Sequence, residues 1–143
     1  PDSSIIDSAM YEEKGKFYLF VKSSPNPDNL LLLVSDHVNG KFERVEGFDD
    51  SMGAQTKGMY EAPTAVKLAH GRWCLFADLY GAGCAGQGYV PFVSDDLTKG
   101  VFTRADEAFH FPYGFKHGTI LPITEEEYER MLARDWTDVP DLR

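Results

Sequence analysis

The stretch IDSAMYEEKGKFYLFVKSS, residues 6–24, recurs with changes as YEAPTAVKLAHGRWCLFADLY, residues 60–80, and this recurrence decides the fold. In each copy a short polar beginning leads through a Lys-Gly or His-Gly turn into an apolar, aromatic run. The chain after each copy also matches, because NLLLLVSDHVNGKFERV at 29–45 corresponds to GYVPFVSDDLTKGVFTRA at 88–105. Self-similarity at a period of this size indicates a repeat architecture.

Each repeat divides into four short runs of strand-forming residues that are separated by turn residues. Lys14-Gly15 and His70-Gly71 separate the first two runs, and Asn39-Gly40 and Lys99-Gly100 precede the last. Asn39-Gly40 is the strongest hairpin signal of the set. Four antiparallel strands in each repeat of about 40–50 residues are typical of β-propeller blades.

A third repeat begins at FPYGFKHGTILPI, residues 111–123, and then stops. The next residues predict a helix instead, because Thr124 and Glu127 have the spacing of a capping box and Tyr128, Met131 and Leu132 share one helical face. We therefore predict an all-β chain with one partial β-propeller domain over residues 1–143. It contains two four-stranded blades at 1–50 and 58–108, the start of a third at 111–123, and a short C-terminal helix at 124–134 packed on the outside.

The charge of the chain argues against some classes of binding partner. The chain has 143 residues, with 23 acidic residues against 14 Lys and Arg, for a net charge of -9. Such a charge repels nucleic acid and anionic membranes, so neither is an expected partner. Residues 1–10 lack the features of a signal peptide. The sequence leaves the location open, with bacterial secretion or the periplasm as one expectation.

An incomplete ring has a consequence for assembly. Two blades and part of a third cannot close a propeller, so strand edges and apolar blade faces are left without cover. We therefore expect association, either with N-terminal blades missing from this chain or with a second copy as a homo-oligomer.

The beginnings of the three repeats carry titratable residues at one aligned position. Asp7 aligns with Glu61, and Glu61 aligns with His117, at spacings of 54 and 56 residues. The first strand of every propeller blade lines the central channel, so these side chains should converge there. Cleavage of a glycosidic bond needs a carboxylic acid for the leaving oxygen and further groups around the sugar. The alternatives are a turn-capping Asp7, a solvated Glu61 and a His117 that is hydrogen-bonded to backbone carbonyls.

The motifs IDSAM, GKFYLF, EAPT, GRWCLF, VSDDL and KHGTILPIT resemble glycoside hydrolase family 43 and its near relatives over about residues 4–134. The resemblance implies a five-bladed propeller that hydrolyses arabinofuranosides and xylosides of plant-type glycans with inversion. It implies that Glu61 is the general acid, that Asp7 modulates the pKa of Glu61, and that His117 binds substrate, water or a cation. It implies no required cofactor, although a calcium ion near the channel axis is compatible with it.

One element of that family pattern is missing. The family's general base is an aspartate on an earlier blade, and no residue before Asp7 stands in a strand that could supply it. We therefore expect the C-terminal part of a catalytic domain that is weakly active or inactive alone. The alternative is a non-catalytic carbohydrate-binding or structural module. Aromatic side chains near turns are candidates for stacking on sugars, and these are Tyr60, Tyr80, Tyr89 and Tyr113.

Overall fold

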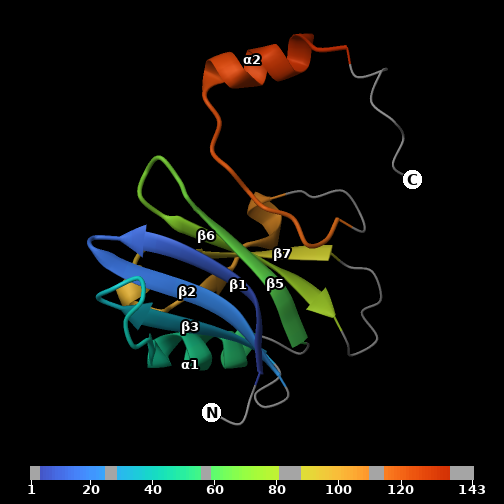
Figure 1. Cartoon of the computed structure of the whole chain (residues 1–143). Coiled ribbons are helices and arrows are strands. Elements are labelled where there is room, and N and C mark those ends of the chain that lie inside the picture. Colours follow the sequence, from blue (N-terminus) through green and yellow to red (C-terminus); the bar gives the residue numbers. More distant parts are fainter. Residues whose placement is uncertain (1–3, 25–28, 56–58, 81–87, 110–114, 136–143) are drawn as a thin grey trace.

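Two four-stranded antiparallel sheets make up most of the protein (Figure 1). The computed structural model describes residues 4–24, 29–55, 59–80, 88–109 and 115–135. Both sheets keep their strands in sequence order. The first contains β1 (Ser4–Glu13), β2 (Lys16–Ser24), β3 (Asn29–Ser35) and β4 (Glu43–Arg44); the second contains β5 (Met59–Lys67), β6 (Trp73–Tyr80), β7 (Gly88–Ser94) and β8 (Thr103–Arg104). The predicted β-rich fold with four strands in each repeat is confirmed.

Four helical segments accompany the sheets in the described part of the chain, and only the C-terminal one was predicted. Helix α1 (Glu46–Gln55) connects the two sheets and buries Phe48 and Met52, so the predicted blade 1–50 ends inside this helix. Its two glycines disfavour a helix, and tertiary packing overrides that preference. The others are η1 (Leu97–Lys99), η2 (Asp106–Ala108) and α2 (Glu125–Ala133). None of the helices in the described ranges has the length and apolar character of a membrane span.

The strand pairing repeats in detail between the two sheets. Lys16 forms an ion pair of 2.7 Å with Asp36, which follows β3, and Arg72 forms one of the same length with Asp95, which follows β7. Lys14 and Gly15 both have positive φ, at 54° and 76°, which suits the predicted tight hairpin between β1 and β2. The connection at Asn39-Gly40 is longer than a two-residue hairpin, because β3 ends at Ser35 and β4 begins at Glu43.

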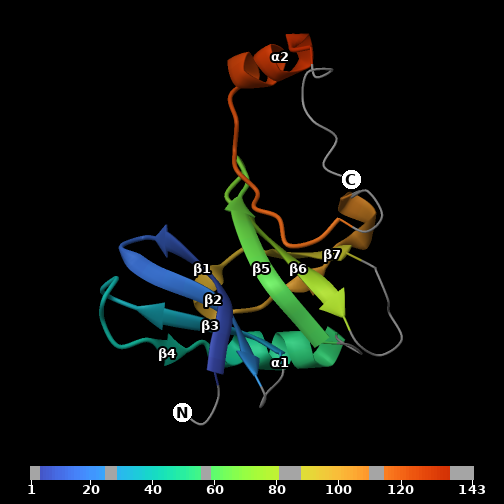
Figure 2. The ribbon, with the colours of Figure 1, turned by 45° about the vertical axis from the view of Figure 1, so that its right-hand side comes forward.

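The main core lies where the first sheet faces β5 and the rest of the second sheet (Figure 2). Tyr18 and Phe20 of β2 point into it from one side, and Trp73 and Leu75 of β6 point into it from the other. The Phe20 ring makes edge-on contacts with Phe48 of α1 and with the Phe102 ring, at centroid distances of 5.8 and 5.9 Å. One aromatic cluster thus joins both sheets and the helix.

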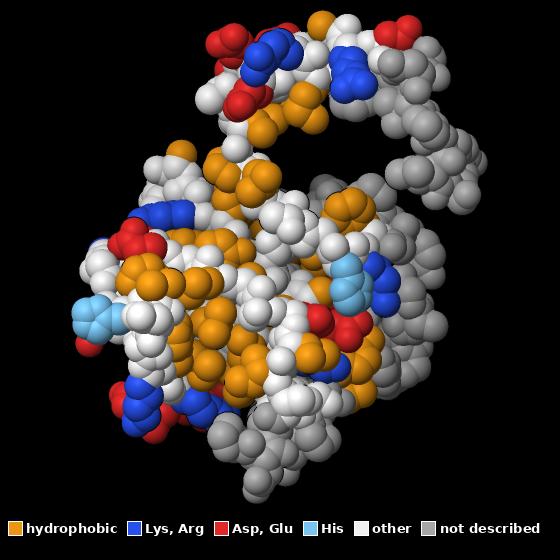
Figure 3. All heavy atoms as spheres, in the orientation of Figure 1, with side chains coloured by type: hydrophobic (Ala, Val, Ile, Leu, Met, Phe, Trp, Pro, Cys, Tyr) orange, Lys and Arg blue, Asp and Glu red, His pale blue; other side chains and the backbone are white. Residues whose placement is uncertain are grey.

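The two faces of each sheet have different surroundings. The second face of the second sheet, with Phe76, is packed against Phe109 and Ile120. By strand register, Phe17 and Leu19 of β2 correspond to Trp73 and Leu75 of β6. Trp73 and Leu75 are buried, whereas Phe17 and Leu19 are only half-buried. Apolar side chains accordingly gather over β1–β3 on the outward face of the first sheet in Figure 3.

The C-terminal part agrees with the prediction only in its helix. Residues 115–123 form no strand although the backbone N–H of Tyr89 in β7 donates to the Phe115 carbonyl, and 111–114 lie outside the described residues. The opening strand of a third blade is therefore not seen. Helix α2 has the predicted capping box between Thr124 and Glu127. It buries no residue and stands away from the sheets in Figures 1 and 2, so the expected packing on the outside is wrong.

A hydroxyl group ties the two sheets together at their first strands. The Tyr11 hydroxyl of β1 accepts a hydrogen bond of 2.7 Å from the backbone N–H of buried Ala65 in β5. We expect Tyr11→Phe to lower the free energy of unfolding by about 1–3 kcal/mol, since it leaves this buried N–H without a partner. Urea denaturation measures the change. Tyr128→Phe on exposed α2 is the matched control and should change little; equal effects of the two variants would contradict the role of the bond.

Candidate functional site

Two of the three aligned strand beginnings contain a β-bulge. The register between β1 and β2 shifts between Ile6 and Ala9, and that between β5 and β6 shifts between Glu61 and Thr64. The backbone has positive φ at Asp7 (51°), Ala62 (47°) and His117 (47°). The structural equivalents are therefore Asp7, Ala62 and His117, each 55 residues apart, and the predicted alignment of Asp7 and His117 with Glu61 is wrong by one residue.

These three positions line one shallow hollow of about 190 Å³ on the surface. Its wall consists of three residue pairs, Asp7 and Ser8, Ala62 and Pro63, and His117 and Gly118. Left-handed backbone at a residue other than glycine costs on the order of 1–3 kcal/mol and is concentrated at functional sites. Three such residues around one hollow make this the strongest candidate for a site among the described residues.

Asp7 holds the bulge of the neighbouring strand. Its Oδ2 accepts a hydrogen bond of 3.1 Å from the backbone N–H of Ala62, the residue that follows Glu61. Asp7 is exposed and therefore also open to a ligand in the hollow. Asp7 is thus linked to Glu61 through the backbone of Ala62.

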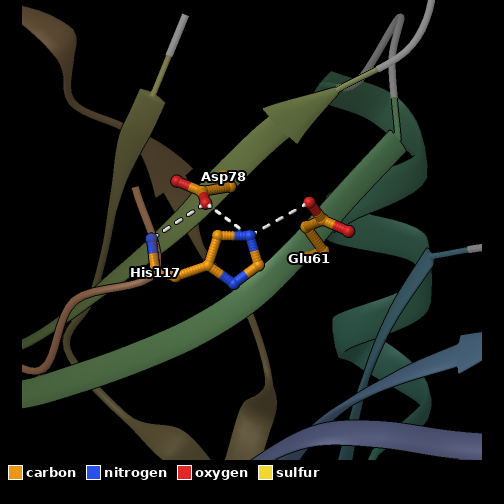
Figure 4. A group of neighbouring side chains, drawn as sticks. All are labelled: Glu61, Asp78 and His117. Atoms are coloured by element: carbon orange, nitrogen blue, oxygen red, sulfur yellow. Dashed lines mark hydrogen bonds and ion pairs between the residues drawn. The ribbon is translucent and has the colours of Figure 1, made fainter. Parts of the chain in front are cut away.

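The Glu61 carboxylate lies between two nitrogen groups (Figure 4). Its Oε1 lies 3.3 Å from Nε2 of His117, and its Oε2 lies 3.6 Å from Nζ of Lys22. The Lys22 ammonium group is nearly buried and lies 4.1 Å from the centre of the Tyr80 ring. Since 21% of the Glu61 side chain is exposed, the carboxylate can be reached from solvent.

Asp78 belongs to the same cluster and was missed by sequence analysis. It has no exposed surface, and its Oδ2 accepts a 3.0 Å hydrogen bond from the backbone N–H of His117 and lies 3.3 Å from Nε2 of the same residue. Burial raises the pKa of Asp78, and the His117 backbone N–H and imidazole oppose that rise. The signal was present, since Asp78 is the one acid in the strand WCLFADLY and pairs across the sheet with Glu61.

Further contacts from the second sheet fix the segment that carries His117. The backbone N–H of Tyr89 donates to the Phe115 carbonyl at 3.2 Å, and the Tyr89 hydroxyl donates to the Gly118 carbonyl at 2.6 Å. A side chain at Gly88 would collide with the Phe115 carbonyl oxygen, so glycine permits this close approach. His117 therefore has a defined position although its segment forms no strand.

The structure also tests the aromatic candidates for sugar stacking. Tyr60 is fully buried and Tyr89 almost so, which removes both as platforms for a sugar ring. Tyr80 is half-buried beside Lys22, and Tyr113 lies outside the described residues. Tyr80 is therefore the one predicted aromatic residue that remains near the cluster in the described part of the chain.

Glu61, Asp78 and His117 could be read as ligands of a metal ion, because their ligand atoms all lie within 4.8 Å of one another. Calcium prefers six to eight oxygen ligands. The cluster provides two carboxylates and an imidazole nitrogen, one Asp78 oxygen already accepts a backbone hydrogen bond, and the Lys22 ammonium group lies beside Glu61. This donor set does not fit the calcium ion that the family resemblance suggests.

The raised pKa of Asp78 predicts how stability depends on pH. Folding favours the protonated form of this carboxyl group. The Asp78 side chain therefore stabilises the folded wild-type protein at low pH, and this stabilisation is lost as pH rises through the folded-state pKa. Asparagine does not titrate and can still accept the bond from the His117 N–H. We expect the unfolding free energy of Asp78→Asn, relative to wild type, to increase as pH rises above about 4, the ordinary pKa of aspartate. Urea denaturation at several pH values measures it.

The control for this prediction has the opposite sign. The hydrogen bond from Lys16 lowers the pKa of exposed Asp36, so Asp36→Asn should lose stability relative to wild type, slightly, as pH rises from acid. Equal pH dependence of Asp78→Asn and wild type would contradict the assignment of Asp78 as a buried, titrating group.

A β-rich fold with two carboxylates and an imidazole beside a bulge-lined hollow is suited to proton transfer at a bound ligand. Residues 1–129 match the model of the family described as "probable glycosyl hydrolase domain", a group related to glycosyl hydrolase family 43. The chain belongs to this family, which bears out the resemblance found in its motifs. Comparison with curated proteins and with solved structures found no match.

Proposed function

We propose that the protein is a glycoside hydrolase that acts with inversion on arabinofuranosides and xylosides of plant-type glycans. The observation that carries the proposal is the position of Glu61 in a chain of this family, at the head of β5 with its carboxylate beside a hollow open to solvent. The family match supports a carbohydrate substrate in general. That the sugar is a pentose and that the reaction inverts the anomeric configuration are proposed in addition.

In this reaction Glu61 acts as the general acid. It gives its proton to the glycosidic oxygen while a water molecule attacks the anomeric carbon from the opposite side of the sugar. Asp7 shapes the hollow by holding the Ala62 N–H and modulates the pKa of Glu61, and exposed His117 faces the substrate. The Lys22 ammonium group stabilises the carboxylate that Glu61 becomes after it has given up its proton.

The two sheets are proposed to be neighbouring blades of a five-bladed propeller. Their equivalent registers and bulges and their packing through one shared core support this arrangement. The half-buried outward face of the first sheet, with Phe17 and Leu19, is where a preceding blade would pack. Association with further blades or with a second copy follows, and light scattering that finds only monomer at high concentration would contradict it.

The general base is still to be assigned. An inverting enzyme places its base about 6.5–9.5 Å from the acid to leave room for water. His117 and Asp78 lie too close to Glu61 for that role. We propose that the base comes from another blade, that the chain alone is weakly active or inactive, and that no cofactor is required.

A non-catalytic carbohydrate-binding module is the second candidate, and one observation favours it. Glu61 has a nitrogen group beside each of its oxygens, which suits a structural ion pair as well as an acid. Incubating the chain with arabino- and xylo-oligosaccharides, and with their 4-nitrophenyl glycosides, separates the two. Release of sugar with inverted configuration supports the hydrolase; binding by calorimetry with no release from any substrate supports the module.

A further inference from the structure

We propose that Asp78 is a positioning residue that holds His117 so that its Nε2 proton is supplied to Glu61. This inference rests on the proposed function, because Glu61 needs a proton only as a general acid. It adds a residue that is not among the family's acid, base and pKa-modulating carboxylates. It also gives His117 a role other than contact with substrate or a cation.

The first step of the argument is how His117 is held. Asp78 contacts it twice through the same oxygen, at the backbone N–H (3.0 Å) and at Nε2 (3.3 Å). The two contacts fix both the main chain and the direction of the ring. Because Asp78 is fully buried in β6, its carboxylate cannot reach a substrate itself. It can therefore act on a substrate only through its neighbours, and its hydrogen bond is with His117.

The second step is the path of the proton. Nε2 of His117 lies between Oδ2 of Asp78 and Oε1 of Glu61, at 3.3 Å from each, as Figure 4 shows. A nitrogen in this position carries one proton that either carboxylate can accept. The imidazole is 53% exposed and lines the hollow, so it exchanges protons with solvent, whereas Glu61 is mostly covered. His117 therefore offers Glu61 a route to solvent protons.

The proton balance of a turnover is as follows. Glu61 gives its proton to the leaving oxygen as the glycosidic bond breaks, and becomes a carboxylate. The His117 imidazolium then transfers its Nε2 proton to Oε1 of Glu61 and becomes neutral. Solvent returns one proton to the imidazole, and the attacking water has released one proton to solvent or base, so the net consumption is one water molecule.

The charges around His117 agree with this exchange. The second sheet contributes Glu61 and Asp78, the hollow adds Asp7, and Lys22 lies behind Glu61. Lys116 is the neighbour in the chain and acts on Asp78. Carboxylates and ammonium groups therefore both surround the ring, so transfer of a proton from Nε2 to Glu61 does not create an isolated charge.

A spectroscopic experiment tests the positioning without any need for activity. Nitrogen-15 NMR at the His117 imidazole, assigned with His117→Gln, reports which nitrogen carries the proton in the neutral ring. In the wild-type protein we expect Nε2–H to dominate. In Asp78→Ala, which has no oxygen to accept from either His117 nitrogen, we expect a mixture of the two tautomers, while Asp36→Ala, which removes an exposed carboxylate, should leave the signal unchanged. An unchanged signal in a folded Asp78→Ala variant overturns the proposal.

A kinetic experiment tests the proton supply. We expect Asp78→Asn to lower the rate of arabino-oligosaccharide hydrolysis by about tenfold or more and to change its pH profile. The rate on 4-nitrophenyl glycosides should fall much less, because a good leaving group needs little help from an acid. Asp78→Glu should restore part of the rate. An equal loss on both substrates overturns the supply role. A wild-type protein that neither binds nor hydrolyses any of these glycosides refutes the proposed function, and the NMR result still decides the positioning.

Discussion

Glu61→Gln is expected to lower the hydrolysis of arabino- and xylo-oligosaccharides by about 10²–10⁴-fold, the usual contribution of a general acid. Glutamine keeps the size of the side chain and can still accept a hydrogen bond from Nε2 of His117, but it has no proton to give to the leaving oxygen. The loss on 4-nitrophenyl glycosides should be much smaller. The ratio of the two losses, taken from kcat/KM values, measures the acid role directly.

The matched control is Glu43→Gln. It removes an exposed carboxylate that pairs with Lys41 at 3.3 Å and is not among the residues that line the hollow. It should not change either rate. Circular dichroism must find all variants folded. If Glu61→Gln hydrolyses oligosaccharides as fast as wild type does, Glu61 is not the acid, and the ion pairs with Lys22 and His117 are structural.

The strands and their partners could be predicted from the sequence because repeated residues occupy repeated positions. Phe17 and Trp73 align in both sequence and structure, since turns absorb the differences in length and strands do not. The first strands were misaligned by one residue. Both first strands carry the bulge at the same place, but sequence matching paired one acid with another, so Asp7 was matched with Glu61 when its equivalent is Ala62.

Two other errors have a common physical cause. The amphipathic pattern of α2 was correctly recognised, but a pattern states which face is apolar and not whether another surface covers it. Asp78 was overlooked because a single acid in an apolar strand looks like an exposed residue until strand register places it opposite Glu61. Local signals predicted elements here, α2 among them, while long-range contacts decided α1 and the cluster around His117.

The largest effect on stability is expected at Phe20. This side chain has no exposed surface, and its ring contacts the rings of Tyr11, Phe48 and Phe102, so it joins the first sheet to α1 and to the residue before β8. Phe20→Ala should lower the free energy of unfolding by about 3–5 kcal/mol through lost burial and the cavity that remains. The total free energy of unfolding of a domain is only about 5–15 kcal/mol, so a much larger fraction of the variant molecules should be unfolded at 37 °C. Urea denaturation measures the loss.

Phe17→Ala is the matched control, because Phe17 lies on the same strand but by register on the outward, half-covered face of the first sheet. In dilute solution it should cost clearly less than Phe20→Ala, since part of the ring is already in contact with water. A copy or a further blade that covers this face would bury Phe17 as well. The cost of Phe17→Ala should then rise with protein concentration, whereas the cost of Phe20→Ala should not. Equal costs for the two variants at low concentration would contradict the assignment of an uncovered outward face.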